Sequence, residues 1–189
     1  GLKKTPYQHP NANAGGSTIV IIPEYKEADK KTNKIGIRLA TVTTRRGTSD
    51  SQDPRLNTLS KLNCITACIE ADKAGADEGI MLDVRGNVST CNSTNFFIVR
   101  SGEVWTSTGQ HCLPGVTRKA IIDICSKNGI PIYEKDFRID SVHSANEAFV
   151  TGTFAGVIPA IEIDGQAMSK SIIGSMTHRL QKFFAILHP

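Results

Sequence analysis

The fold follows from residues 79–107, which read GIMLDVRGNVSTCNSTNFFIVRSGEVWTS. The stretch holds four short apolar segments. A tight turn at Val84-Arg85-Gly86 separates the first segment from the second, and one at Ser101-Gly102 separates the third from the fourth. Short strands divided by turns that contain glycine are typical of an antiparallel meander. We therefore predict four consecutive strands, at residues 79–83, 87–91, 95–100 and 103–107.

The segments around the meander add helices and further strands. Apolar residues at helical spacing predict helices over 63–74, 116–128 and about 172–187, with a shorter helix near 140–144. Extended apolar runs predict strands at 17–23, 35–43, 131–136, 148–152 and 157–164, and Asp164-Gly165 is a good hairpin turn. Antiparallel strands then outnumber helices. We expect an α+β fold, a barrel-like and largely antiparallel sheet with helices packed outside it.

Composition narrows the function classes. A chain of 189 residues favours one domain and at most two. No apolar run approaches the roughly 20 residues of a membrane span, so no membrane contact is expected. The net charge of +4 is mild and the basic residues are dispersed, which disfavours nucleic acid as a partner. The five cysteines show neither a disulfide framework nor metal-ligand spacing, which indicates reduced thiols and no metal site.

The N-terminal residues have the character of an internal segment of a longer polypeptide. The chain begins at Gly1 without methionine and runs directly into a polar, turn-rich stretch. A processed product and the back half of a longer protein both agree with this beginning. We assign residues 1–34 to an N-terminal segment with an entry strand, continuing from a missing N-terminal domain, and residues 35–189 to the main domain.

Leu113-Pro114-Gly115-Val116-Thr117-Arg118 opens the helix predicted after the meander. A helix N-terminus presents unpaired N–H groups and a positive dipole end, so it can bind phosphate without a lysine. Gly115 allows close approach of the backbone, and Thr117 adds a hydroxyl. A similar stretch lies downstream at residues 151–156. The alternative is a helix start at a Pro-Gly turn with a purely structural role.

Several ordered blocks then resemble the class IV aminotransferases, the pyridoxal-phosphate family of branched-chain and D-amino-acid aminotransferases and aminodeoxychorismate lyase. The resemblance spans residues 35 to about 188 and implies the large C-terminal domain of that family, a pseudo-barrel. The family's smaller N-terminal domain has no counterpart in the chain. The matching blocks are residues 60–63, 74–83, 86–88 with 95–99, 113–118 and 145–153, followed by Pro159 and Asp164-Gly165.

The resemblance implies that Lys61, followed by Leu62-Asn63, forms the imine with the cofactor and shuttles the proton in catalysis. This chemistry needs an amine that is neutral part of the time, which burial and nearby positive charge favour. The spacing from lysine to asparagine is slightly shorter here than in the better-known members. A surface lysine at a helix start is the alternative interpretation of Lys61.

The same resemblance implies a phosphate cup. It would consist of the backbone N–H of Val116, the backbone and hydroxyl of Thr117, and the hydroxyl of Thr153. An arginine that usually completes the cup lies in the family's N-terminal domain.

Two residues depart from the family's pattern. Thr90 stands where members usually carry a glutamate that keeps the pyridine nitrogen protonated, and a hydroxyl would stabilise negative charge on the ring less. Thr90 is therefore expected at the cofactor nitrogen, or as an ordinary strand residue. Cys64 stands where branched-chain enzymes often have a tyrosine that touches the phenolic oxygen of the cofactor.

Several other polar residues have both a functional and a purely structural interpretation. Arg45, Arg46 and Arg100 could meet a substrate carboxylate or lie in solvent at turns. Asn92 and Ser93 could line the edge of the cofactor or form the turn between two strands.

The resemblance implies a cytoplasmic, homodimeric pyridoxal-phosphate aminotransferase, branched-chain-like, that acts on an amino acid and a 2-oxo acid. A lyase of the aminodeoxychorismate lyase type would use the same lysine and phosphate cup. A weakened, non-enzymatic relative is the third hypothesis, supported by Thr90 and the missing domain.

Overall fold

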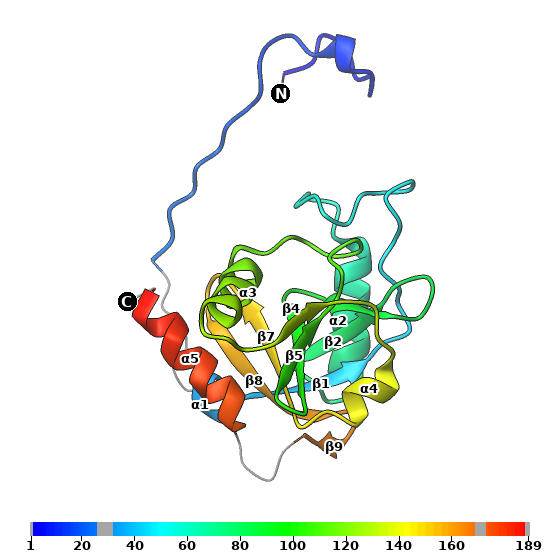
Figure 1. Cartoon of the computed structure of the whole chain (residues 1–189). Coiled ribbons are helices and arrows are strands. Elements are labelled where there is room, and N and C mark those ends of the chain that lie inside the picture. Colours follow the sequence, from blue (N-terminus) through cyan, green and yellow to red (C-terminus); the bar gives the residue numbers. More distant parts are fainter. Residues whose placement is uncertain (1, 26–31, 169–172, 188–189) are drawn as a thin grey trace.

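The computed structural model describes residues 2–25, 32–168 and 173–187. One curled sheet runs through it in the order β3-β2-β1-β8-β7-β4-β5-β6, with β9 paired to β8 (Figure 1). The strands are β1 (Ile37–Thr41), β2 (Glu78–Leu82), β3 (Val88–Cys91), β4 (Asn95–Arg100), β5 (Glu103–Thr106), β6 (Ile132–Glu134), β7 (Glu147–Gly152), β8 (Gly156–Ile163) and β9 (Gln166–Ala167).

The helices are α1 (Thr32–Ile35), α2 (Leu62–Lys73), α3 (Val116–Lys127), α4 (Ile139–His143) and α5 (Ser175–Leu187), with a short 3₁₀ turn, η1 (Pro10–Ala12). The predicted helices over 63–74 and 116–128 are thus confirmed to within a residue or two. The start predicted for the last helix, at about residue 172, lies outside the described residues. No helix in the described part of the chain is both long and apolar enough to cross a membrane.

The expected α+β fold is confirmed, with one correction to its sheet. Hairpins β2–β3 and β4–β5 are antiparallel as predicted, but β3 does not pair with β4, so the meander is interrupted. The reason is that β4 takes β7 as its second neighbour. β1 also lies parallel to both β2 and β8, and β5 lies parallel to β6. The sheet is therefore mixed.

The predicted strand at 17–23 is wrong. These residues are extended but unpaired, and Figure 1 shows them leading away from the sheet. Their large side chains lie in solvent, with Ile19 82% and Ile21 84% exposed. A β-branched run favours extended backbone, but a strand also needs a neighbouring strand, and the described residues offer none here.

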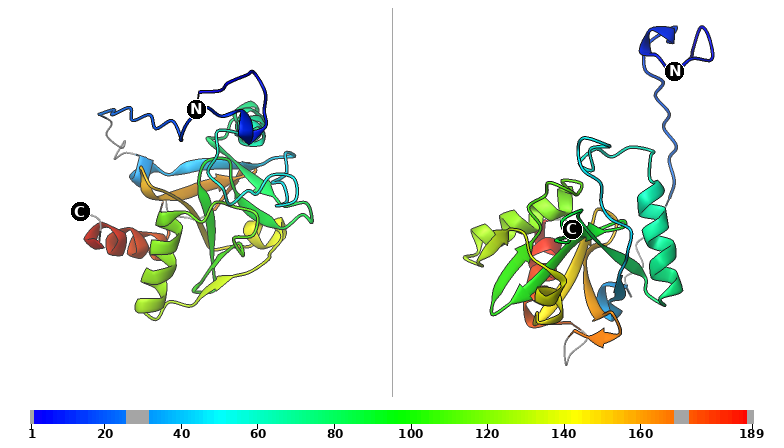
Figure 2. Two further views of the ribbon diagram at one scale, coloured as in Figure 1. Left: turned by 90° about the horizontal axis from the view of Figure 1, so that it is seen from above. Right: turned by 90° about the vertical axis from the view of Figure 1, so that its right-hand side faces the viewer.

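Two faces of the sheet carry separate cores. The concave face is filled by side chains such as Leu39, Phe96 and Val142 of α4. α3 and α5 pack against the other face (Figures 1 and 2). In that core the rings of Phe97 and Phe149 stack, with 4.8 Å between ring centres. α2 covers β1 and β2 through a small third cluster. This layering places the N-terminus of α3 beside the end of β7.

Candidate functional site

The first turn of α3 presents N–H groups that no described residue accepts. Gly115 is the N-cap and carries no side-chain cap, and the first carbonyl bonded to the helix is that of Gly115, which accepts from Lys119 at 2.9 Å. The N–H groups of Val116, Thr117 and Arg118 precede that bond, so they remain donors without a partner among the described residues. Together with the positive end of the helix dipole, they form an environment that favours an anion.

Three residues singled out in the sequence meet at this helix end. Val116, Thr117 and Thr153 line one pocket of about 700 Å³ between α3, α5 and the turn after β7. Thr117 is buried, Thr153 is exposed, and neither hydroxyl has a hydrogen-bond partner among the described residues. The pocket therefore adds two free hydroxyls to the free N–H groups.

The structure does not bring Lys61 to this pocket. Lys61 is the exposed residue before α2, and its Nζ donates to Oδ1 of Asn57 at 2.7 Å. It lines a separate pocket of about 480 Å³, formed by residues between 44 and 66. The described lysine that lines the pocket at α3 is Lys34 of α1.

Thr90 is buried in β3 and lines neither of these two pockets. Its hydroxyl donates to the carbonyl of Thr94 at 2.7 Å, within the turn that leads to β4. A cofactor contact by Thr90 stays a prediction.

Asn92 and Ser93 form the turn between β3 and β4. Asn92 accepts from the N–H of Gly79 at 2.6 Å, and Ser93 donates to the Glu78 carboxylate at 2.7 Å. Burial raises the pKa of the Glu78 carboxyl, although the hydroxyls of Ser93 and Thr94 oppose this effect. Of the two interpretations, the structure supports the turn.

Arg46 has a larger role than the sequence indicated. Its side chain is buried, and Nε donates to the carbonyl of His111 at 3.2 Å while Nη2 donates to that of Pro54 at 3.1 Å. Nη1 contacts Sγ of Cys64 at 2.9 Å. Arg46 thus joins the segment before Lys61 to the loop before α3. Nothing in the sequence distinguishes it from Arg45, which is exposed.

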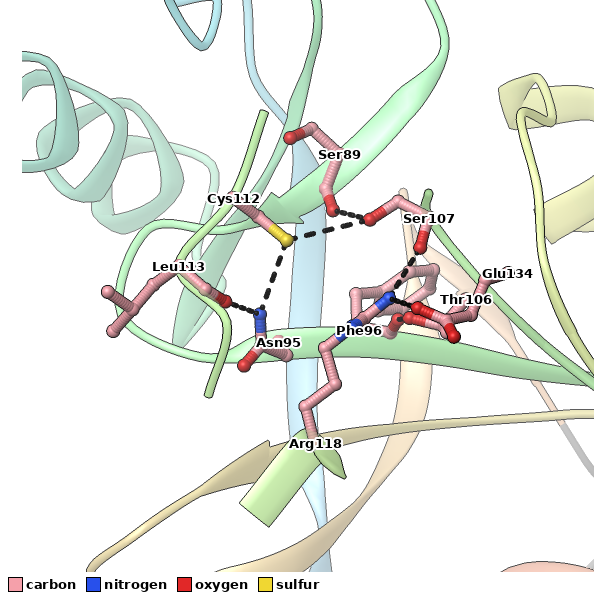
Figure 3. Close-up of polar contacts among 9 residues, drawn as sticks. All are labelled: Ser89, Asn95, Phe96, Thr106, Ser107, Cys112, Leu113, Arg118 and Glu134. Atoms are coloured by element: carbon pink, nitrogen blue, oxygen red, sulfur yellow. Dashed lines mark hydrogen bonds and ion pairs between the residues drawn. The ribbon is translucent and has the colours of Figure 1, made fainter. Parts of the chain in front are cut away.

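Arg118 lies in the first turn of α3 but turns away from the helix end. Nη2 donates to the carbonyl of Ser107 at 2.6 Å and to Glu134 at 2.8 Å (Figure 3). Its positive charge is therefore paired with the Glu134 carboxylate, away from the N-terminal end of the helix. Within α3, the donors for an anion at the helix end are therefore the N–H groups and the Thr117 hydroxyl, not the Arg118 guanidinium.

The family model for amino-transferase class IV matches residues 3–163. The chain is 35% identical over 184 residues to branched-chain-amino-acid aminotransferase-like protein 2 of Arabidopsis thaliana, which covers 97% of this chain and 33% of that protein.

Solved structures agree with this match. A branched-chain aminotransferase of Thermoproteus uzoniensis with norvaline is 35% identical, with a TM-score of 0.75 over 79% of this chain and 50% of that one. An aminotransferase of Brucella abortus bound to the cofactor PLP is 26% identical, with a TM-score of 0.76 over 88% of this chain and 56% of that one. The chain thus spans between a third and a little more than half of the relatives it matches.

Proposed function

Because the chain belongs to the class IV aminotransferase family, we propose that it carries the phosphate-binding part of a pyridoxal-phosphate site. The reaction proposed for the whole protein transfers an amino group between an amino acid, branched-chain-like, and a 2-oxo acid. The names of the relatives support this substrate class. The observation that carries the proposal is the set of free N–H groups at the start of α3 in a pocket that two threonine side chains also line.

The residues present fit the phosphate end of the cofactor. The N–H groups of Val116 and Thr117 and the hydroxyls of Thr117 and Thr153 are donors, which is what a phosphate dianion requires. Pyridoxal phosphate supplies the carbonyl carbon to which the amino group is transferred. The helix end would hold this group by its phosphate and orient the ring toward the substrate.

Lys61 is proposed as the amine that binds the cofactor covalently and moves the proton at the substrate Cα. In the structure its Nζ is bonded to Asn57 in the other pocket, so it must exchange that partner to reach a cofactor held at α3. The same separation favours the third hypothesis, a weakened relative that binds the cofactor without being an enzyme. The two hypotheses differ in whether a lysine becomes modified.

A trapping experiment tests both. The protein is incubated with pyridoxal phosphate, reduced with borohydride and digested, and the modified lysine is identified by mass spectrometry. We expect modification at Lys61, its loss in Lys61→Ala, and no change in Lys73→Ala, a control at the C-terminal end of the same helix.

Two other results would change the proposal. Modification of Lys34 would assign the amine to the lysine that lines the α3 pocket. Retention of pyridoxal phosphate through dialysis without any modified lysine would support the non-enzymatic hypothesis.

We further propose a cytoplasmic homodimer. The five cysteines are free in the structure, in agreement with a reducing compartment. Sedimentation of the purified protein would test the dimer.

A further inference from the structure

Asn95, the first residue of β4, lies directly beneath the loop that precedes α3 (Figure 3). The residue is buried, and its Nδ2 donates to the carbonyl of Leu113 at 3.0 Å. The same nitrogen lies 3.6 Å from Sγ of Cys112. One amide group therefore contacts two consecutive residues of the loop.

Gly115 packs against the other side of this amide. A Cβ added to Gly115 would lie 2.2 Å from Oδ1 of Asn95, closer than any van der Waals contact allows. The backbone of Gly115, with φ −62° and ψ 138°, is open to any residue, so glycine is needed here for space and not for conformation. Asn95 thus fixes the loop at Leu113 by a hydrogen bond and at Gly115 by contact.

The two contacts of Asn95, with Leu113 and with Gly115, lie directly before the N-terminal end of α3. Because Gly115 is the N-cap, its position sets the direction of the N–H groups of Val116 and Thr117. Arg118 cannot substitute for them, since its guanidinium is paired with Glu134. The binding of an anion at this helix end therefore depends on how the loop is held.

A second buried group faces the same region. Thr151 of β7 lies opposite Asn95 in the register of β4 and β7, so both side chains are on one face of the sheet. Thr151 is only 1% exposed, and its Oγ1 has no hydrogen-bond partner among the described residues. A buried hydroxyl without a partner is costly, so Thr151 is a polar group beside Asn95 that no described residue satisfies.

We propose that Asn95 is a positioning residue for the phosphate group: it holds the loop of Leu113 to Gly115 so that the first N–H groups of α3 converge on the anion. The inference rests on the proposed function, because it takes the phosphate of pyridoxal phosphate as the ligand. Asn95 itself does not touch the ligand.

The test compares pyridoxal phosphate with pyridoxal, which lacks the phosphate, in binding titrations. The wild-type protein is expected to prefer pyridoxal phosphate. In Asn95→Ala, affinity for pyridoxal phosphate should fall at least tenfold, while affinity for pyridoxal should change less than twofold. Thr106→Val is the matched control, since it removes one buried hydrogen bond, to the carbonyl of Phe96, without touching the loop. It should keep the wild-type preference.

Gly115→Ala provides an independent variant. In the wild-type background its Cβ meets the Asn95 amide, so phosphate preference should fall. In the Asn95→Ala background the space is open, and the added Cβ should have a much smaller effect. This non-additivity is a readout that general destabilisation would not produce.

The outcomes separate the inference from the proposed function. A wild-type protein that binds pyridoxal and pyridoxal phosphate equally would refute the phosphate cup itself. A wild-type preference that survives in Asn95→Ala would refute the role of Asn95 alone. If Asn95→Ala does not fold, Gly115→Ala decides, and full phosphate preference in that variant overturns the inference.

Discussion

At the scale of single residues, Asp164 joins three elements at one end of the sheet. Its carboxylate accepts from the N–H of Thr41 at 2.6 Å, from the hydroxyl of Thr41 at 2.8 Å, and contacts Nε2 of His143 at 2.8 Å. Burial alone raises the pKa of the Asp164 carboxyl, but these hydrogen bonds and the His143 ring outweigh burial and lower it. The ionised carboxylate therefore stabilises the fold.

This lowered pKa predicts a dependence of stability on acid. A carboxyl with a lower pKa in the folded state stabilises the protein above its unfolded pKa of about 3.9, and the contribution is lost as pH falls through the folded value. Urea unfolding between pH 5 and pH 3 should show a smaller loss of stability in Asp164→Asn than in the wild type. Asparagine tolerates the positive φ of 52° at this position, so the turn is kept.

Thr41→Val serves as the graded control for this prediction. It keeps Asp164 and the backbone donor but removes the hydroxyl donor, so its acid dependence should lie between the other two. Identical slopes for all three proteins would show that the pKa of Asp164 does not differ between the folded and unfolded states.

At the scale of elements, the N-terminus of α5 is capped by a carboxylate from a distant part of the sequence. Glu147 of β7 is buried, and it accepts from the N–H of Met176 at 2.9 Å and from that of Thr177 at 2.8 Å. The Thr177 hydroxyl donates to the same carboxylate at 2.8 Å. A negative charge at a helix N-terminus is favourable, so Glu147 both caps α5 and attaches it to the sheet.

Glu147→Gln should lower the free energy of unfolding by about 1–2 kcal/mol, because charge-assisted hydrogen bonds at a helix end become neutral ones. For a chain of this length the unfolding midpoint should fall by roughly 2–8 °C, measured by circular dichroism. Ser175→Ala is the control, since the Ser175 hydroxyl is 3.5 Å from Glu147 and should contribute little. Equal midpoints for Glu147→Gln and the wild type would contradict the capping role.

Elements with their own periodicity could be predicted from the sequence, and their partners could not. α2, α3 and the two hairpins follow from helical spacing and glycine turns. The pairing of β4 with β7 depends on residues some fifty positions apart, which no local pattern encodes. The unpaired segment 17–23 has the composition of a strand, so only the absence of a neighbour among the described residues distinguishes it.

Some features of the candidate site could likewise be predicted from the sequence, and others could not. The anion environment at α3 was predicted because Gly115 indicates the start of a helix and Thr117 adds a hydroxyl in its first turn. Asn95 was missed as a site residue, although a polar residue at the start of an apolar strand is a detectable signal. The position of Lys61 could not be derived, since it depends on how the long connector from residue 45 to 60 is held by Arg46.

At the scale of the whole molecule, the sheet and its helices account for the stability, and the N-terminal segment stands apart. Residues 2–14 make a single bridge, between Lys3 and Asn13, and the next residues extend into solvent (Figure 1). The segment therefore exposes four consecutive apolar side chains, Ile19, Val20, Ile21 and Ile22. Such an exposed apolar segment is a region of potential association.

Replacing Ile19 and Ile21 together with threonine should leave the free energy of unfolding within about 0.5 kcal/mol of the wild type, because both side chains are already exposed. Binding of the dye ANS and light scattering at high concentration should both decrease. Ile80→Thr, at a fully buried position, is the contrasting variant and should be strongly destabilising. A clear loss of stability in the double variant would mean that the segment is packed in solution.

The position of β1 between β2 and β8 has a consequence for how the chain is made. On the ribosome, β1 and β2 emerge early, but the register that joins Ile37 to Ala160 exists only when β8 has been synthesised. Until then one edge of β1 is open, and contacts between such distant residues form slowly because a long loop must close. The middle of the sheet is therefore completed late in synthesis, and the unpaired edge of β1 is a place where incomplete chains can aggregate until then.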